Sequence, residues 1–199
     1  MRAYRDGIVK LLRRRAVLGL CLMAAFRSMA QNGLLMFLPL YLTNVLKVEP
    51  VVMGAAIMAM HFGGVVISPI AGVVSDRIGR RPVVMAGLAG TTVLIVALTF
   101  VENATYYVAG VSVLGFVLYA VRPVIHSWMM DLAPSDMRGS ATSVLFGTQA
   151  ALSVAVPVVG GAVADTWGLA EVFYVIAAVM LVANAMVIFL PAPEATQKI

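Results

Sequence analysis

Charged residues are scarce in this chain. Asp, Glu, Lys and Arg make up only 12% of its 199 residues, whereas about a quarter of residues are charged in a typical soluble domain. Hydrophobic residues reach 62%, and the mean hydropathy is +0.99. This composition excludes an ordinary soluble domain and indicates an integral membrane protein.

The residue types that build catalytic and metal sites are also rare. The single cysteine, Cys21, has no partner for an intrachain disulfide, and the chain has only two histidines. Ser127 directly follows His126, and adjacent residues of a helix point in different directions, so a Ser-His pair is not indicated. The sequence has neither a metal-ligand cluster nor a phosphate-binding glycine loop. It therefore predicts no enzyme, no metal and no cofactor.

What the chain has instead is a series of long apolar stretches. A helix needs about 20 apolar residues to cross a bilayer, and six stretches qualify, separated by polar turn segments. We expect an all-α membrane protein with a basic arm (1–15), a six-helix bundle (16–190) and a short tail (191–199). The predicted spans are 16–42, 51–74, 83–101, 105–130, 140–164 and 170–190.

Basic residues flank these spans almost entirely on one side of the membrane. Lys and Arg in short loops stay cytoplasmic, so we predict a protein of the cell (inner) membrane with both termini in the cytoplasm. The net charge of +5 does not indicate nucleic acid as a partner, because the basic residues border apolar spans instead of lying among exposed aromatic residues. The predicted cytoplasmic side carries Arg2, Arg5, Lys10, Arg13, Arg14, Arg15, Arg77, Arg80, Arg81, Arg138 and Lys198, and the other side carries Lys47.

An internal repeat divides the six spans into two groups of three. "PIAGVVSDRIG" (69–79) in the second span is matched by "PVVGGAVADTWG" (157–168) in the fifth, with one extra residue. The pattern predicts repeats at 16–101 and 105–190. Because three is an odd number, the second repeat is expected to lie inverted in the membrane.

The polar segment "GVVSDRIGRRP" (72–82) resembles the signature loop of the major facilitator superfamily, G-x-x-[SA]-D-[RK]-x-G-R-[RK]-P, between two spans. "DLAPSDMRGSATS" (131–143) is similar to a second loop of that family. Because members have twelve or more spans, the resemblance implies one half of a major facilitator fold. The basic segment 2–15 and the tail "PAPEATQKI" favour the carboxyl-terminal half. Val156 replaces a glycine of the antiporter pattern, so an antiporter is not supported.

The signature loop predicts a conformational latch. Gly72 would permit close helix approach, and Gly79 would adopt a positive φ. Asp76 would accept hydrogen bonds from helix N-terminal amides, and Arg77 or Arg80 would reach Asp131. The resemblance implies that the acid of this loop, here Asp76, stabilises the outward-facing state, although the basic residues serve equally as topological anchors. The candidate latch residues are Gly72, Asp76, Arg77, Gly79, Arg80, Arg81 and Asp131.

Polar side chains at mid-depth predict a substrate site, because such residues are costly in the bilayer and are usually functional. Arg27 and Arg122 are expected about 16 Å and about 13 Å from the cytoplasmic ends of their helices. The spans that carry such residues are expected to line a cavity, while the third and sixth spans face lipid. A packing role remains open for each amide and histidine. The candidate substrate-binding residues are Arg27, Gln31, Asn32, His61, Arg122, His126 and Gln149.

The resemblance implies secondary active transport of a small solute by alternating access. The expected partners are the lipid bilayer and either another six-helix half or a second copy of the chain, and the paired arginines favour an anionic or zwitterionic solute. No predicted span contains Asp or Glu, so protons, if they drive transport, must be carried by His61, by His126 or by an absent half. The alternative is a complete six-helix channel or a structural membrane subunit.

Overall fold

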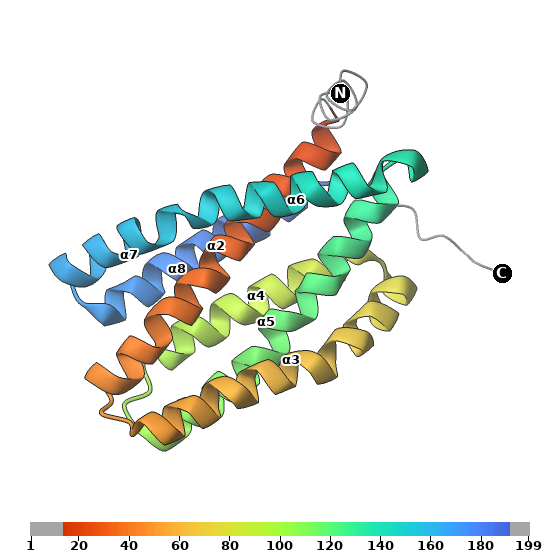
Figure 1. Ribbon diagram of the computed structural model, residues 1–199. Coiled ribbons are helices and arrows are strands. Elements are labelled where there is room, and N and C mark those ends of the chain that lie inside the picture. Colours follow the sequence, from red (N-terminus) through yellow and green to blue (C-terminus); the bar gives the residue numbers. More distant parts are fainter. Residues whose placement is uncertain (1–13, 192–199) are drawn as a thin grey trace.

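The computed structural model describes residues 14–191, and this part of the chain is a bundle of long helices (Figure 1). Most of the predicted basic arm and the predicted tail lie outside the described residues. The elements are α2 (Arg15–Asn44), α3 (Pro50–Ile78), α4 (Arg80–Leu98), α5 (Ala104–Leu132), the short 3-10 helix η1 (Ser135–Met137), α6 (Arg138–Ser153), α7 (Ala155–Thr166) and α8 (Leu169–Ile188).

Six helical segments of the described chain are long and apolar enough to cross a membrane. This finding confirms the predicted all-α membrane fold, and the helix bounds differ from the predicted ones by a few residues. The fifth predicted span is confirmed as one apolar stretch, Ser135–Thr166, but its helix is interrupted at Val154, between α6 and α7. Pro157 has no N–H to donate to the carbonyl of Ser153, so the helical hydrogen-bond ladder is interrupted at this point.

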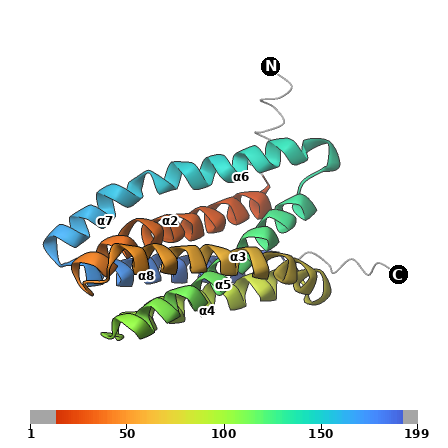
Figure 2. The same cartoon turned by 60° about the horizontal axis from the view of Figure 1, so that its bottom comes forward.

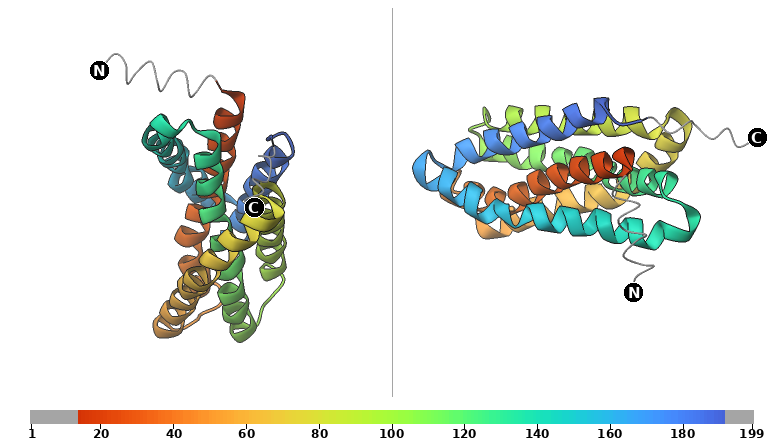
Figure 3. Two further views of the ribbon diagram at one scale, coloured as in Figure 1. Left: turned by 90° about the vertical axis from the view of Figure 1, so that its right-hand side faces the viewer. Right: turned by 90° about the horizontal axis from the view of Figure 1, so that it is seen from above.

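Helix packing follows the predicted two-fold repeat. α3 packs on α5 much as α6 and α7 pack on α2, and α4 packs on α5 as α8 packs on α2, while α4 and α8 contact each other. If the first three spans are exchanged for the last three, the contacts of α5 become those of α2, and the contact between α4 and α8 is unchanged. Figure 2 shows α6 and α7 running end to end along one side of α2. Both ends of the described chain lie at the same end of the bundle as the α3–α4 and α5–α6 connections (Figure 3). A chain that crosses a membrane six times must begin and end on the same side.

The close contact between α3 and α5 depends on a glycine, which has no side chain, at position 115 of α5. A Cβ atom added at Gly115 of α5 would lie 2.2 Å from the carbonyl oxygen of Met60 in α3. Only glycine lets the two backbones approach this closely, as small residues commonly do between membrane helices. Gly115 thus fixes the distance between α3 and α5, two of the helices that position the site.

Candidate functional site

A cavity of about 500 Å³ lies between α2, α3, α5 and α6. No residue of α4 or α8 lines it. The lining is mixed: apolar residues such as Leu145 and Phe146 alternate with polar groups. The polar lining residues are Arg27, Ser68, Arg122, His126, Thr142 and Gln149.

The two arginines reach this cavity at similar depth. At 1.5 Å per residue, Arg27 lies about 18 Å from the start of α2 and Arg122 about 15 Å from the end of α5. Both distances are about half of a hydrocarbon core of roughly 30 Å. The cavity therefore places two positive charges near the middle of the expected membrane span.

Arg27 is buried without a counter-charge. Arg27 is only 4% exposed. Its Nη2 atom donates a hydrogen bond of 2.8 Å to the carbonyl oxygen of Leu118 in α5. Pro123 lies inside α5 and has no N–H to donate to the carbonyl of Tyr119, the residue after Leu118. The Nε atom of Arg27 is buried and has no hydrogen-bond partner. Within residues 14–191 no carboxylate pairs with Arg27, which leaves a buried cation suited to an anionic ligand.

Arg122 and His126 extend the polar surface along α5. They are four residues apart, so they lie on one face of the helix. Arg122 is exposed, whereas the Nδ1 atom of His126 is buried and has no hydrogen-bond partner. The imidazole ring of His126 lies 5.9 Å, centroid to centroid, from the ring of Phe146 in α6. The lining residues include no Asp or Glu.

Three predicted site residues lie outside this cavity. Gln31 is buried one turn beyond Arg27. Asn32 donates a hydrogen bond of 2.8 Å from Nδ2 to Oγ of Ser153, which joins α2 to the end of α6. His61 is exposed, and its Nδ1 atom lies 2.8 Å from the carbonyl oxygen of Ile57 in its own helix. The structure thus brings together Arg27, Arg122, His126 and Gln149, and separates Gln31, Asn32 and His61 from them.

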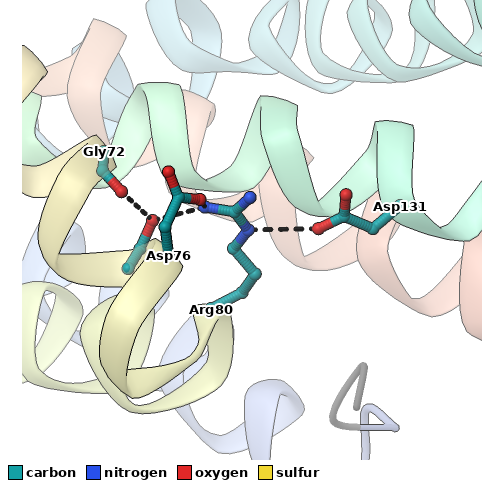
Figure 4. A network of polar contacts seen from close by, with 5 residues as sticks. Gly72, Asp76, Arg80 and Asp131 are labelled. Atoms are coloured by element: carbon teal, nitrogen blue, oxygen red, sulfur yellow. Dashed lines mark hydrogen bonds and ion pairs between the residues drawn. The ribbon is translucent and has the colours of Figure 1, made fainter. Parts of the chain in front are cut away.

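A second polar cluster surrounds Arg80 at the start of α4 (Figure 4). Arg80 donates from Nε to Asp131 of α5 at 3.1 Å and from Nη1 to Oγ of Ser75 at 2.6 Å, and it forms an ion pair with Asp76. Ser75 in turn donates to the carbonyl oxygen of Gly72 at 2.8 Å. Sequence reasoning missed Ser75, which is 1% exposed. The signal that could have identified Ser75 is its place in the signature loop, directly before Asp76.

The remaining latch candidates differ in what they contact. Gly79 has a φ of +97°, as expected for a tight turn between α3 and α4. Within the described residues no neighbouring helix approaches Gly72 closely, because a Cβ there would meet no atom within 4 Å. Asp76 pairs with Arg80 and not with helix N-terminal amides in the described chain, where Arg77 forms no ion pair. Arg81 donates from Nη2 to the carbonyl oxygen of Ile188 at 2.5 Å, at the end of α8.

Residues that could hold a metal do not cluster in the described part of the chain. No group of three or more His, Cys, Asp or Glu side chains there is arranged to bind an ion. The described residues thus form two polar clusters. One is the cavity that contains the guanidinium groups of Arg27 and Arg122. The other is the network of hydrogen bonds and ion pairs around Arg80, at the end of the bundle that the predicted topology places in the cytoplasm.

Two bacterial transporters are similar to this chain in sequence. It is 25% identical over 153 residues to the multidrug efflux pump Tap of Mycolicibacterium fortuitum, an alignment that covers 77% of this chain and 37% of the pump. It is 29% identical over 152 residues to the probable nitrate/nitrite transporter NarK2 of Mycobacterium tuberculosis, covering 76% of this chain and 38% of that protein. The chain thus matches little more than a third of the length of these relatives.

Solved structures share the fold. The nucleoside transporter NupG superposes with a TM-score of 0.80 at 13% identity, over 92% of this chain and 46% of NupG. A peptide transporter, POT, gives a TM-score of 0.76 at 16% identity, over 94% of this chain and 41% of the transporter. These relatives are named as transporters and not as enzymes. The family model of the Major Facilitator Superfamily matches residues 20–199, so the chain belongs to that superfamily.

Proposed function

We propose that the chain is one six-helix half of a secondary active transporter that moves a small solute by alternating access. In this proposal it lies in the cell (inner) membrane with both termini in the cytoplasm, because the basic residues collect at that end. The observation that carries the proposal is the cavity between α2, α3, α5 and α6, with the buried, partly unpaired Arg27 in its wall. Membership of a transporter superfamily supports it.

The proposed substrate is anionic or zwitterionic. Arg27 and Arg122 bring a formal charge of +2 to the cavity, and no lining carboxylate offsets it. A planar guanidinium offers two parallel N–H donors to a carboxylate or to another planar oxyanion. A volume of about 500 Å³ lies within the common range for small-molecule pockets. A relative named as a nitrate/nitrite transporter supports an anion in particular.

The proposed partner is a second six-helix unit, either another half or a second copy. α3 and the segment formed by α6 and α7 are the least buried of the six spans. These spans also line the cavity, so a unit packed against them would complete its wall. Alternating access requires two such units to rock about a shared site. Asn32 and His61, which are exposed outside the cavity, are then available to that unit.

The proposed latch is the network around Arg80. Arg80 connects the end of α3 to the end of α5, while the side chain of Asp76 is 62% exposed and accessible to a partner unit. Asp76→Asn should retain insertion and expression but change the balance of inward and outward states, by a few kcal/mol at most. The measurement is the labelling of cysteines from each side of the membrane. Unchanged labelling would reduce the loop to a topological signal.

Uptake by the assembled transporter tests the substrate site. Arg122→Lys and Arg122→Gln are compared with wild type at matched membrane levels, with nitrate and dialanine as charged probes and uridine as a neutral probe. We expect Arg122→Gln to weaken apparent affinity for a charged probe and Arg122→Lys to weaken it less. Normal affinity in both variants would remove Arg122 from the site. Strong flux through the isolated monomer in proteoliposomes would contradict the half-transporter proposal and favour the channel.

A further inference from the structure

We propose that the cavity continues into an aromatic surface, formed by Phe116 and Tyr119 of α5, and that the transported anion is an aromatic carboxylate. This inference rests on the proposed anion site and names the class of anion that the site holds. It starts from Arg122, which lines the cavity. Tyr119 lies three residues before Arg122, and Phe116 lies three residues before Tyr119. Residues three apart are neighbours on a helix surface, so the two rings extend the cavity wall toward the start of α5.

α3 continues the cavity wall in the same direction. Ser68 lines the cavity, and Gly64 lies four residues before it, on the same face of α3. A Cβ atom added at Gly64 would lie 2.7 Å from Cγ of Tyr119. A Cβ atom added at Gly63 would lie 2.8 Å from the ring of Phe116. Both rings therefore pack against the backbone of α3 at positions where glycine leaves room, and this packing fixes them next to the cavity.

Both rings keep part of their surface free within the described chain. Phe116 is 39% exposed, and Tyr119 is half-buried. The ring of Tyr119 lies 5.4 Å, centroid to centroid, from the ring of His61, which is exposed. At 1.5 Å per residue, Tyr119 and Phe116 lie about 4.5 Å and about 9 Å beyond Arg122 along α5. A ligand held at the arginines can thus reach exposed aromatic surface within one to two helical turns.

An aromatic carboxylate matches both parts of this wall. Its carboxylate accepts two parallel N–H bonds from a guanidinium, as Arg27 or Arg122 can provide. A benzene ring attached to that carboxylate is about as long as one helical turn, so it extends from Arg122 to the level of Tyr119 and Phe116. Aromatic rings attract one another in offset-stacked or edge-to-face arrangements, which a saturated ring of similar size cannot adopt. The wall therefore favours benzoate over a saturated carboxylate.

Phe62 of α3 is a matched control for Phe116. It is also exposed, at 67%, and at 1.5 Å per residue both phenylalanines lie about 24 Å from the cytoplasmic ends of their helices. Phe62, however, shares a face of α3 with Met58 and Val65, which are exposed as well. That face differs from the one that carries the cavity-lining Ser68. A change at Phe62 should therefore leave ligand preference intact.

The test measures the binding of benzoate, cyclohexanecarboxylate and nitrate to the full chain in lipid nanodiscs at neutral pH, with any partner that co-purifies. Each aromatic pair contributes about a factor of two at the lower end of the measured range. With two rings, we expect wild type to bind benzoate about fivefold more tightly than cyclohexanecarboxylate. Phe116→Leu and Tyr119→Leu should each reduce this preference to about twofold and leave nitrate affinity unchanged. Phe116→Tyr, which keeps a ring, and Phe62→Leu should retain the fivefold preference.

The outcomes separate this inference from the anion site on which it rests. Equal affinity of wild type for benzoate and cyclohexanecarboxylate, with nitrate bound, would overturn the inference and leave the anion site standing. A fivefold preference that persists in both leucine variants would overturn it in the same way. Loss of the co-purifying partner in Phe116→Leu would show that the ring packs against a second unit, which also overturns it. Absence of binding of all three anions to wild type would overturn the inference together with the anion site.

Discussion

Replacing Arg27 by methionine separates a binding role from a structural one, because the two roles predict changes of opposite sign in stability. Methionine keeps a long unbranched side chain but removes the charge. A buried ion that lacks a counter-ion carries a desolvation penalty of several kcal/mol. Arg27 is such an ion, since it is 4% exposed and its Nε atom has no partner. The substitution removes this penalty.

The stabilising interaction that Arg27→Met removes is small in comparison. The hydrogen bond from Arg27 to the carbonyl of Leu118 disappears, and a bond to a charged donor is worth about 1.5–3 kcal/mol. The carbonyl is not left unpaired, because in an α-helix it also accepts from the N–H of residue 122. We therefore expect Arg27→Met to raise the free energy of unfolding by about 1–3 kcal/mol, while it abolishes nitrate binding.

The assay is thermal unfolding in detergent, followed by circular dichroism and by the fluorescence of the buried Trp128. Arg122→Met is the matched control. Arg122 is exposed, so the free energy of unfolding of this variant should stay within about 0.5 kcal/mol of wild type, although nitrate binding is again lost. A decrease of more than about 1 kcal/mol in Arg27→Met alone would refute the reasoning and show that Arg27 is held for packing.

Three further predictions concern the packing of the bundle and the latch. Gly79→Ala should lower the free energy of unfolding by about 1–3 kcal/mol, because a φ of +97° is strained for alanine, while Gly72→Ala, with open space around the new Cβ, should be neutral; equal effects in the two variants would contradict this. Gly115→Ala should lower it by at least about 1–3 kcal/mol, because the new Cβ overlaps the Met60 carbonyl, and a wild-type melting curve would show that α3 and α5 adjust freely. Asp131→Asn should cost less than about 1 kcal/mol, because the Asp131 side chain is 42% exposed, and a loss well above that value would mean that the pair is shielded from solvent.

Hydropathy and repeat patterns were enough to predict most of the fold. The six spans are long apolar runs, and burial of such runs in lipid leaves few alternatives to helices. The break at Val154 was missed because hydropathy does not register the missing N–H of Pro157. Pro69 occupies the corresponding place in the first repeat, yet α3 is continuous there. Whether a proline turn stays helical depends on packing, which the local sequence does not contain.

For the candidate site residues, the sequence predicted the depth along each helix but not the direction in which each side chain points. Helical rise fixes how far Arg27 and Arg122 lie along their helices, so their common depth followed from the sequence. Which face of a helix meets the cavity depends on the rotation of that helix against its neighbours. Gln31 and Asn32 illustrate this limit: the first is buried beyond the cavity, and the second bonds to Ser153 outside it.

The interruption between α6 and α7 has a consequence for biosynthesis. At 1.5 Å per residue, the 16 residues of α6 extend about 24 Å and the 12 residues of α7 about 18 Å. Neither length reaches across a hydrocarbon core of about 30 Å. The insertion machinery must therefore accept the two helices as a single segment, and the combined stretch Ser135–Thr166 is apolar enough for that. The interruption at Val154 would then form after entry into the bilayer, when the segment packs on α2.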